Sequence, residues 1–191
     1  MSRFLKSDWQ SLVPYTPGEQ PRDMQRLIKL NTNECPYPPS PKVLAAIDGR
    51  AVSALNLYPD PECKALKAAF AGAYGVTPQN VTVSNGSDEV LAFAFQAYGE
   101  HGVTYPDISY GFYRVFAEVY GLRAVEVPLR DDFSLAVEDY AGKRGTVFIA
   151  NPNAPTGLAV SRADVEKLLL QDRSRPVVVD EAYVDFGGES A

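Results

Sequence analysis

The chain has 191 residues, 46% of them hydrophobic and 22% charged, which suits one globular domain with a buried core or a piece of a larger one. Its net charge of −6, without any basic stretch, argues against nucleic-acid binding. The single histidine, His101, and the two cysteines, Cys35 and Cys63, lack the spacing of metal ligands, so we predict no metal site.

The start, "MSRFLKSDWQSLVPY", lacks the continuous apolar core of a signal peptide. No stretch approaches the roughly 18 apolar residues of a membrane span, so we predict no membrane partner. A reduced, cytoplasmic setting fits this cysteine usage best.

Residues 1–40 are rich in proline, asparagine and polar residues, and we expect an extended N-terminal arm there, followed by a partial α/β domain over 41–191. The segment 58–75 predicts a helix. Asp60 can cap it, Pro61 suits its first turn and Gly75 can end it.

From residue 81 onward, strand and helix patterns alternate. The apolar segment 146–150, "TVFIA", is typical of a strand that is covered on both faces. The alternation predicts an α/β fold with a mostly parallel sheet and helices on both faces. The predicted strands are 81–84, 102–105, 123–128, 146–150 and 175–180, and the predicted helices are 87–99, 110–121 and 161–171.

Polar or glycine-bearing turns follow four of these strands. They read "NGSDE", "PDISY", "NPNAPTG" and "DEAY". Because ligands of parallel sheets gather at the carboxyl ends of the strands, we expect a binding site at this edge.

Each turn has an ordinary structural explanation beside the functional one. Ser87 and Asp88 can simply cap a helix, or the same helix start can bind a phosphate. The "NPNAPTG" segment can be a tight loop or can hold an amide at the sheet edge. A carboxylate at Asp180, after a buried strand, is costly unless it meets a cation or hydrogen-bond donors. Tyr183 can be a core tyrosine or can point its hydroxyl into the same space.

Taken in order, "LNTNECPYPPSPKV", "LYPDP", "NGSDE", "ISYGFYRVFAE", "NPNAPTG" and "VVVDEAY" resemble the amino-terminal half of the histidinol-phosphate aminotransferase family, which are fold-type I pyridoxal-phosphate enzymes. The resemblance covers about residues 10 to 188. It implies the large cofactor-binding α/β domain of that fold, a homodimer and a small-molecule amino-acid or phosphate substrate.

The resemblance also implies roles for individual residues. Asp180 would pair with the pyridine nitrogen of pyridoxal 5'-phosphate, which keeps the ring protonated as an electron sink. Tyr183 and Asn153 would contact the phenolic oxygen of the ring, and Tyr110 would lie against its face. The remaining implied positions are Gly86, Ser87 and Asp88 for the phosphate, Tyr58 for the phosphate of the neighbouring subunit, and Tyr15 and Asn33 for the substrate.

The chain departs from the family pattern in three ways. Ala154 and Cys35 stand where relatives often have asparagine. The Schiff-base lysine of the family is expected beyond Ala191, so the resemblance implies a truncated enzyme with no catalytic residue in this chain.

Other functions remain open on the sequence. A related aromatic-amino-acid aminotransferase or a threonine-phosphate decarboxylase would share these motifs. A non-catalytic fragment that only binds the cofactor or dimerises is a further alternative. A nucleotide-binding protein ranks last, because neither G-x-G-x-x-G nor G-x-x-x-x-G-K-[ST] occurs.

Overall fold

The computed structural model describes residues 6–13, 16, 28–47 and 49–191. The chain separates into two compact units, Met1–Val13 with Ser84–Ala191, and Pro14–Val83. The predicted division into an arm (1–40) and a partial domain (41–191) stays a prediction.

The unit Pro14–Val83 contains the helices α1 (Pro41–Ala46), α2 (Gly49–Ser53) and α3 (Lys64–Tyr74). The predicted helix at 58–75 exists as α3, but it begins at Lys64 rather than Pro61. The reason is that Cys63 has a left-handed backbone (φ 50°), which interrupts the helix before Lys64.

Gly75 ends α3 as the sequence predicts, whereas the N-cap is Cys63 and not Asp60, although the Asp60 carboxylate still accepts from the first N–H of the helix. The backbone N–H groups of Glu62 and Lys64 donate to the Asp60 carboxylate at 3.0 and 2.8 Å. Gly75 ends the helix with φ 68°, a conformation that favours glycine.

The predicted strand at 81–84 is wrong. Val81 is buried and has an extended backbone (φ −111°, ψ 122°), so the alternating pattern does correspond to an extended segment. However, a strand also needs a hydrogen-bonded neighbour, and none of the strands in the described residues pairs with 81–84.

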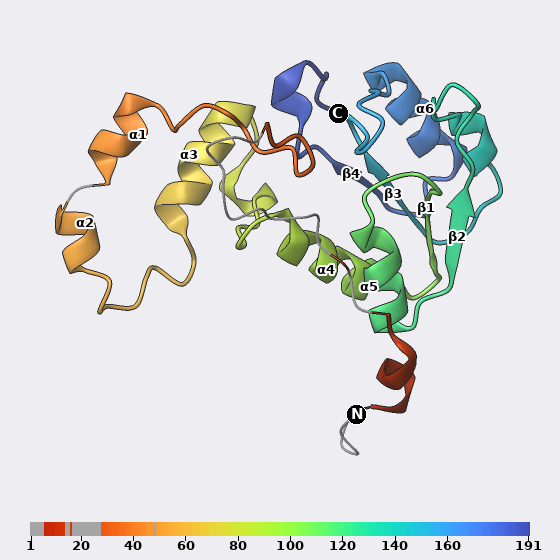
Figure 1. Ribbon diagram of the computed structural model, residues 1–191, viewed down its shortest axis with the longest axis horizontal. Helices are drawn as coiled ribbons and strands as arrows, with labels where there is room; N and C mark the ends of the chain where they lie inside the picture. Colours follow the sequence, from red (N-terminus) through yellow and green to blue (C-terminus); the bar gives the residue numbers. More distant parts are fainter. Residues whose placement is uncertain (1–5, 14–15, 17–27, 48) are drawn as a thin grey trace. The chain divides into compact units, whose positions relative to one another are not determined.

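The other unit is built on a four-stranded parallel sheet with the order β2-β1-β3-β4 (Figure 1). This confirms the prediction of an α/β fold with a parallel sheet. The strands are β1 (Val103–Pro106), β2 (Ala124–Val127), β3 (Thr146–Ala150) and β4 (Val177–Asp180). The three predicted helices are present as α4 (Ser87–Tyr98), α5 (Phe112–Tyr120) and α6 (Arg162–Gln171).

The helix ends follow from local sequence. Gly121 stops α5 with φ 66°. Ser161 caps α6 by accepting a hydrogen bond from the Asp164 N–H at 3.2 Å.

Both faces of the sheet are covered, because β3 is buried along its whole length and its side chains alternate between two cores. Phe148 and Ala150 pack with residues of α4 and α5, while Val147 and Ile149 pack with residues of α6 and the 3₁₀ turn Val137–Tyr140. The first core consists of Leu91, Ala94, Phe95, Val103, Tyr105, Tyr113, Ala117, Phe148 and Ala150. The second consists of Val127, Val137, Tyr140, Val147, Ile149, Val165 and Leu168.

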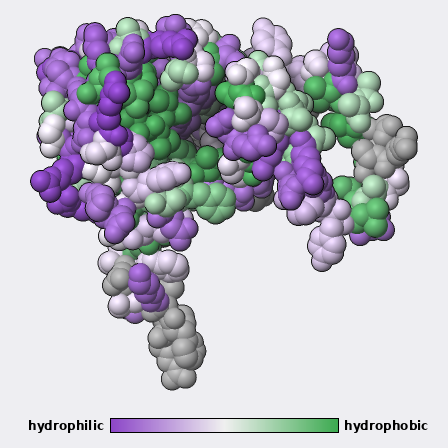
Figure 2. Space-filling model, turned by 180° about the vertical axis from the view of Figure 1, so that it is seen from behind, coloured by the Kyte–Doolittle hydropathy of each residue, from purple (hydrophilic) through white to green (hydrophobic). Residues whose placement is uncertain are grey.

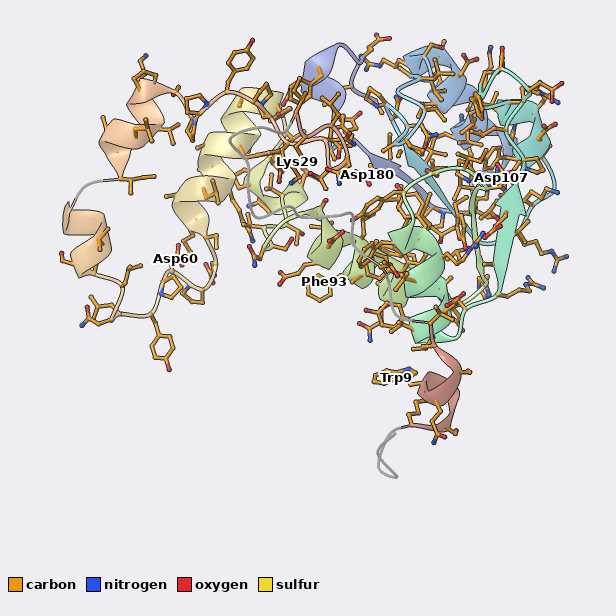
Figure 3. The ribbon with its side chains drawn as sticks, viewed as in Figure 1. Trp9, Lys29, Asp60, Phe93, Asp107 and Asp180 are labelled. Carbon is orange, nitrogen blue, oxygen red and sulfur yellow. The ribbon has the colours of Figure 1, made fainter. Side chains whose placement is uncertain are left out.

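A short 3₁₀ helix near the N-terminus, Ser7–Ser11, is attached to the sheet-bearing unit. The indole N–H of Trp9 donates to the Val119 carbonyl of α5 at 3.2 Å (Figure 3). Part of the predicted arm therefore packs on α5.

Hydrophobic side chains also reach the surface, and Figure 2 shows them gathered in green areas on one face. In the sheet-bearing unit, Val90 and Phe93 of α4 are among the exposed ones. In the part of the chain that the structure describes, no helix has the length and apolar character to cross a membrane.

Candidate functional site

The sheet has a topological switch point between β1 and β3. The connection from β1 leads to β2 on one side of β1, and the next connection leads to β3 on its other side. Loops that follow two such strands diverge and leave room for a ligand at their carboxyl ends. Here the two loops are joined by two hydrogen bonds: Ser109 Oγ donates to Asn153 Oδ1 at 2.7 Å, and the Asn153 amide donates to the Ile108 carbonyl at 3.0 Å.

Asp180 is the last residue of β4 and lies at this same edge (Figure 3). Its Oδ2 accepts a hydrogen bond from the Tyr113 hydroxyl at 3.1 Å, and its Oδ1 accepts one from the Ala182 N–H at 3.2 Å. Burial raises the pKa of the Tyr113 hydroxyl, and the negative charge of Asp180 raises it further. Tyr113 therefore remains a protonated donor and holds the carboxylate in one orientation.

Sequence reasoning missed Tyr113. It lies in the first turn of α5, three positions after Tyr110, which precedes the N-cap Gly111, and the two rings are 5.8 Å apart in an edge-on arrangement. Its partner is 67 positions away in the chain. The only available signal was this spacing within "ISYGFYRVFAE".

A small cavity of about 90 Å³ brings four predicted site residues together. A whole ligand pocket typically measures roughly 300–1,000 Å³, so this cavity accounts only for the part of a ligand nearest Asp180. The residues that line it are Ser87, Tyr110, Ala150, Pro152, Asp180, Ala182 and Tyr183.

The start of α4 supplies backbone donors to this edge. The N-cap is Gly86, and it makes no side-chain capping bond. The first N–H groups of the helix, together with the positive end of its dipole, suit an anion. Asp88 has its carboxylate turned to Tyr110, whose hydroxyl donates to Asp88 Oδ1 at 2.7 Å. Its contribution to anion binding would therefore come from its backbone N–H.

Gly86 is required by its backbone, since φ 81° and ψ 172° define a region that only glycine populates readily. A Cβ here would meet no atom within 4 Å, so the cost of Gly86→Ala is purely conformational. We expect about 1–3 kcal/mol of lost unfolding free energy and about 10-fold weaker binding of a phosphate-bearing ligand. Urea unfolding and ligand titration would measure both.

Gly121→Ala is the matched control for Gly86→Ala. Gly121 also has a positive φ (66°) and open space, but it ends α5. It should lose about 1 kcal/mol of stability without changing ligand affinity. Equal loss of affinity in both variants would show that Gly86 acts only through stability.

Asn153 is buried, with 7% of its surface exposed, and does not line the cavity. Its amide donates to the Ile108 carbonyl at 3.0 Å and to Thr156 Oγ1 at 3.1 Å. A contact between this amide and a cofactor ring would need one of these bonds to be exchanged. Asn151, which sequence reasoning missed, is fully buried. Its amide donates to the Val160 carbonyl at 3.0 Å, and its Oδ1 accepts from the Val160 N–H at 2.8 Å, which fixes the turn between the two residues.

Three predicted residues lie in the other unit or outside the described residues. Tyr58 is fully exposed within its unit. Asn33 is exposed and has a left-handed backbone, φ 54°. Tyr15 lies outside the described residues.

The residues at this edge fit pyridoxal phosphate. Asp180 already accepts two hydrogen bonds, and a carboxylate has acceptor capacity for a further N–H donor. The uncapped start of α4 fits a phosphate, and the ring of Tyr110 lines the space between them.

Comparison with known proteins agrees with this geometry. The aminotransferase class I and II family matches residues 25–191. The chain belongs to this family. Family membership accounts for the α/β fold with its parallel sheet.

Within this aminotransferase family, named relatives are about half identical to the chain. It is 54% identical to the histidinol-phosphate aminotransferase of Acetobacter pasteurianus, with all of this chain and 54% of that protein covered. It is 48% identical to the one from Clostridium acetobutylicum, again over 100% of this chain and 54% of the relative. The chain thus spans about half the length of the curated relatives it matches.

Solved aminotransferase structures share the fold. The histidinol-phosphate aminotransferase of Sinorhizobium meliloti, in complex with pyridoxal-5'-phosphate, is 29% identical with a TM-score of 0.71, over 77% of this chain and 42% of that one. The L-threonine-O-3-phosphate decarboxylase of Porphyromonas gingivalis has a TM-score of 0.65 over 74% of this chain and 45% of its own. At 22% identity it shows similarity of fold alone.

The hydrogen bond from Tyr113 to Asp180 gives this candidate site a direct test. Tyr113→Phe removes one hydroxyl and should weaken cofactor binding about 10–100-fold, because a hydrogen bond to a charged group contributes about 1.5–3 kcal/mol. Tyr105→Phe is the control, since the Tyr105 hydroxyl bonds Glu126 at 3.5 Å and does not reach Asp180. Unchanged affinity in Tyr113→Phe would show that Asp180 needs no positioning by this hydroxyl.

Proposed function

We propose that this edge of the sheet binds pyridoxal 5'-phosphate and that the protein is a histidinol-phosphate aminotransferase. The observation that carries the proposal is the Asp180 carboxylate, fixed by Tyr113 and Ala182 and facing a cavity lined by Ser87, Tyr110 and Tyr183. The relatives named above support the choice of reaction.

In this proposal each site residue has one contact with the cofactor. Asp180 would hold a proton on the pyridine nitrogen of the cofactor, and that cation would compensate its partly buried charge. The N–H groups of Gly86, Ser87 and Asp88 would bind the phosphate. Tyr110 would lie against the ring, and Tyr183, with Asn153 after exchange of a bond, would contact its phenolic oxygen.

When bound, pyridoxal phosphate supplies an electron sink for the carbanion at the α-carbon of the substrate. The proposed reaction moves the amino group of L-histidinol phosphate to 2-oxoglutarate, which gives imidazole-acetol phosphate and L-glutamate. The residues of this chain would bind and orient the cofactor.

We further infer a cytoplasmic homodimer. Tyr58 is fully exposed within its own unit, so its hydroxyl is accessible to a neighbouring subunit, where it would reach the phosphate. Tyr15 and Asn33 would line the substrate side.

A decarboxylase acting on threonine phosphate and an aromatic-amino-acid aminotransferase are the alternatives within the same fold. The Porphyromonas gingivalis enzyme has a similar fold, which is why the decarboxylase is an alternative. The relatives at about half identity favour histidinol phosphate as the substrate. A fragment that binds the cofactor without turnover is a third alternative for the 191-residue chain.

The test uses the natural polypeptide that contains this sequence, with the 191-residue chain in parallel. Each is incubated with pyridoxal phosphate, reduced with borohydride and weighed intact. Glutamate formation from L-histidinol phosphate and 2-oxoglutarate is then followed. One cofactor adduct and glutamate release from the natural polypeptide would support the proposal. Carbon dioxide release from threonine phosphate, or preference for phenylalanine, would replace it with one of the alternatives.

A further inference from the structure

A second cavity lies at the opposite edge of the sheet. It measures about 360 Å³ and is lined by residues that include Tyr98, His101, Arg144, Asp172, Arg175 and Pro176. Arg144 and Arg175 precede β3 and β4, whereas Asp180 ends β4. Since all strands are parallel, this cavity is at the amino-terminal edge, away from the proposed cofactor site.

Arg175 is the unusual residue of this amino-edge cavity, because only 7% of its surface is exposed. Its Nη1 donates to the carbonyls of Tyr140 and Lys143 at 3.1 and 2.7 Å, and its Nη2 donates to Gln171 Oε1 at 3.2 Å. These acceptors are all neutral, and Nε has no hydrogen-bond partner. Among the described residues no carboxylate forms an ion pair with this guanidinium.

The charge of Arg175 contributes to the lowered pKa of Asp172, after the hydrogen bonds from Ser174, but the two groups form no ion pair. A buried guanidinium without an ion pair is costly, so it favours an anion in the adjoining space. Arg144 adds a second guanidinium and His101 an imidazole to the lining. The one carboxylate in the lining, Asp172, is turned to Ser174, whose N–H and Oγ donate to it at 2.9 and 2.5 Å. The cavity is therefore electropositive within a chain whose net charge is −6.

We propose that the amino-edge cavity binds a small phosphate monoester. Guanidinium groups match phosphate geometry through paired N–H donors, and Arg144 is exposed and able to supply them. The buried charge of Arg175 attracts the same group, while Tyr98 and Pro176 offer an apolar wall for the organic part of the ester. This site is separate from the start of α4 and does not rest on the proposed aminotransferase activity.

The chain provides its own reporter, because His101 is its only histidine and lines this cavity. In proton NMR its imidazole Cε1–H signal needs no assignment. Inorganic phosphate and then glycerol phosphate are titrated into the full chain at constant ionic strength, with sodium chloride as the balancing salt. The proposal expects a saturable shift of this signal with both, and backbone amide shifts at Gly145 and Thr146.

Arg144→Gln is the test variant, and Arg162→Gln is its matched control. Both arginines are exposed, but Arg162 begins α6. Arg144→Gln should weaken phosphate binding about 5–10-fold, as for loss of one charge-assisted contact, while Arg162→Gln leaves it unchanged. A non-saturating shift, or equal binding in Arg144→Gln, would overturn the proposal. Amide shifts confined to Gly86–Asp88 would also overturn it and would instead support the phosphate role of α4.

Discussion

Replacing Asp180 with asparagine should reduce cofactor affinity and transamination together, each by about 10²–10³-fold. The carboxylate is held by the Tyr113 hydroxyl and the Ala182 N–H, and it faces the cavity that we assign to the cofactor ring. An amide is nearly the same size but carries no charge, so it cannot stabilise a protonated ring nitrogen. Loss of a charged partner from a buried pair costs about 3–5 kcal/mol, and the expected effect lies in the lower part of this range because Asp180 is only partly buried.

The experiment compares Asp180→Asn with Asp185→Asn in the natural polypeptide, by cofactor titration and by the rate of glutamate formation. Asp185 undergoes the same chemical change, but it is exposed in the 3₁₀ turn Val184–Phe186. It should retain near-normal affinity and rate. If Asp180→Asn kept normal affinity and turnover, the ring nitrogen would not lie at this carboxylate, and the proposed orientation of the cofactor would be wrong.

The helices and strands of the sheet-bearing unit could be predicted from the sequence because nearby residues mark where they begin and end. Gly121 can adopt the left-handed conformation that ends α5, and Ser161 caps α6 through the Asp164 N–H. The segment "TVFIA" is buried on both faces because no polar residue interrupts it, apart from Thr146 at its start. The strand at 81–84 was predicted wrongly because pairing depends on a neighbour that local pattern does not reveal.

The candidate site was predictable where residues follow strand ends, and less so elsewhere. Ser87, Tyr110, Asp180 and Tyr183 meet at one cavity, as expected of turns at the carboxyl edge of a parallel sheet. Tyr113 and Asn151 were missed because both are ordinary residue types whose roles depend on distant or buried partners. The same holds for Arg175, whose burial could not be read from "RSRPVVVD".

Replacing Phe148 with alanine should lower the free energy of unfolding of the sheet-bearing unit by about 3–5 kcal/mol. Phe148 is fully buried in β3, and its ring stacks on Phe95 of α4 with centroids 3.9 Å apart. The same ring lies 6.1 Å from that of Tyr113, the donor to Asp180. Its loss would leave a cavity between the sheet and the helices α4 and α5. The free energy of unfolding should fall, and Asp180 should be held less firmly in position.

Phe93→Ala is the control for this change, because Phe93 lies on α4 but is 56% exposed and points away from the sheet (Figure 3). It should change stability by about 0.5 kcal/mol or less. Urea unfolding can be followed by the fluorescence of Trp9, the only tryptophan, which bonds α5 in the same unit. Equal destabilisation by both variants would mean that the exposed face of α4 is packed in solution. A small effect of Phe148→Ala would mean that the core between β3 and α4 can close over the lost ring, so that this contact does not fix the position of Tyr113.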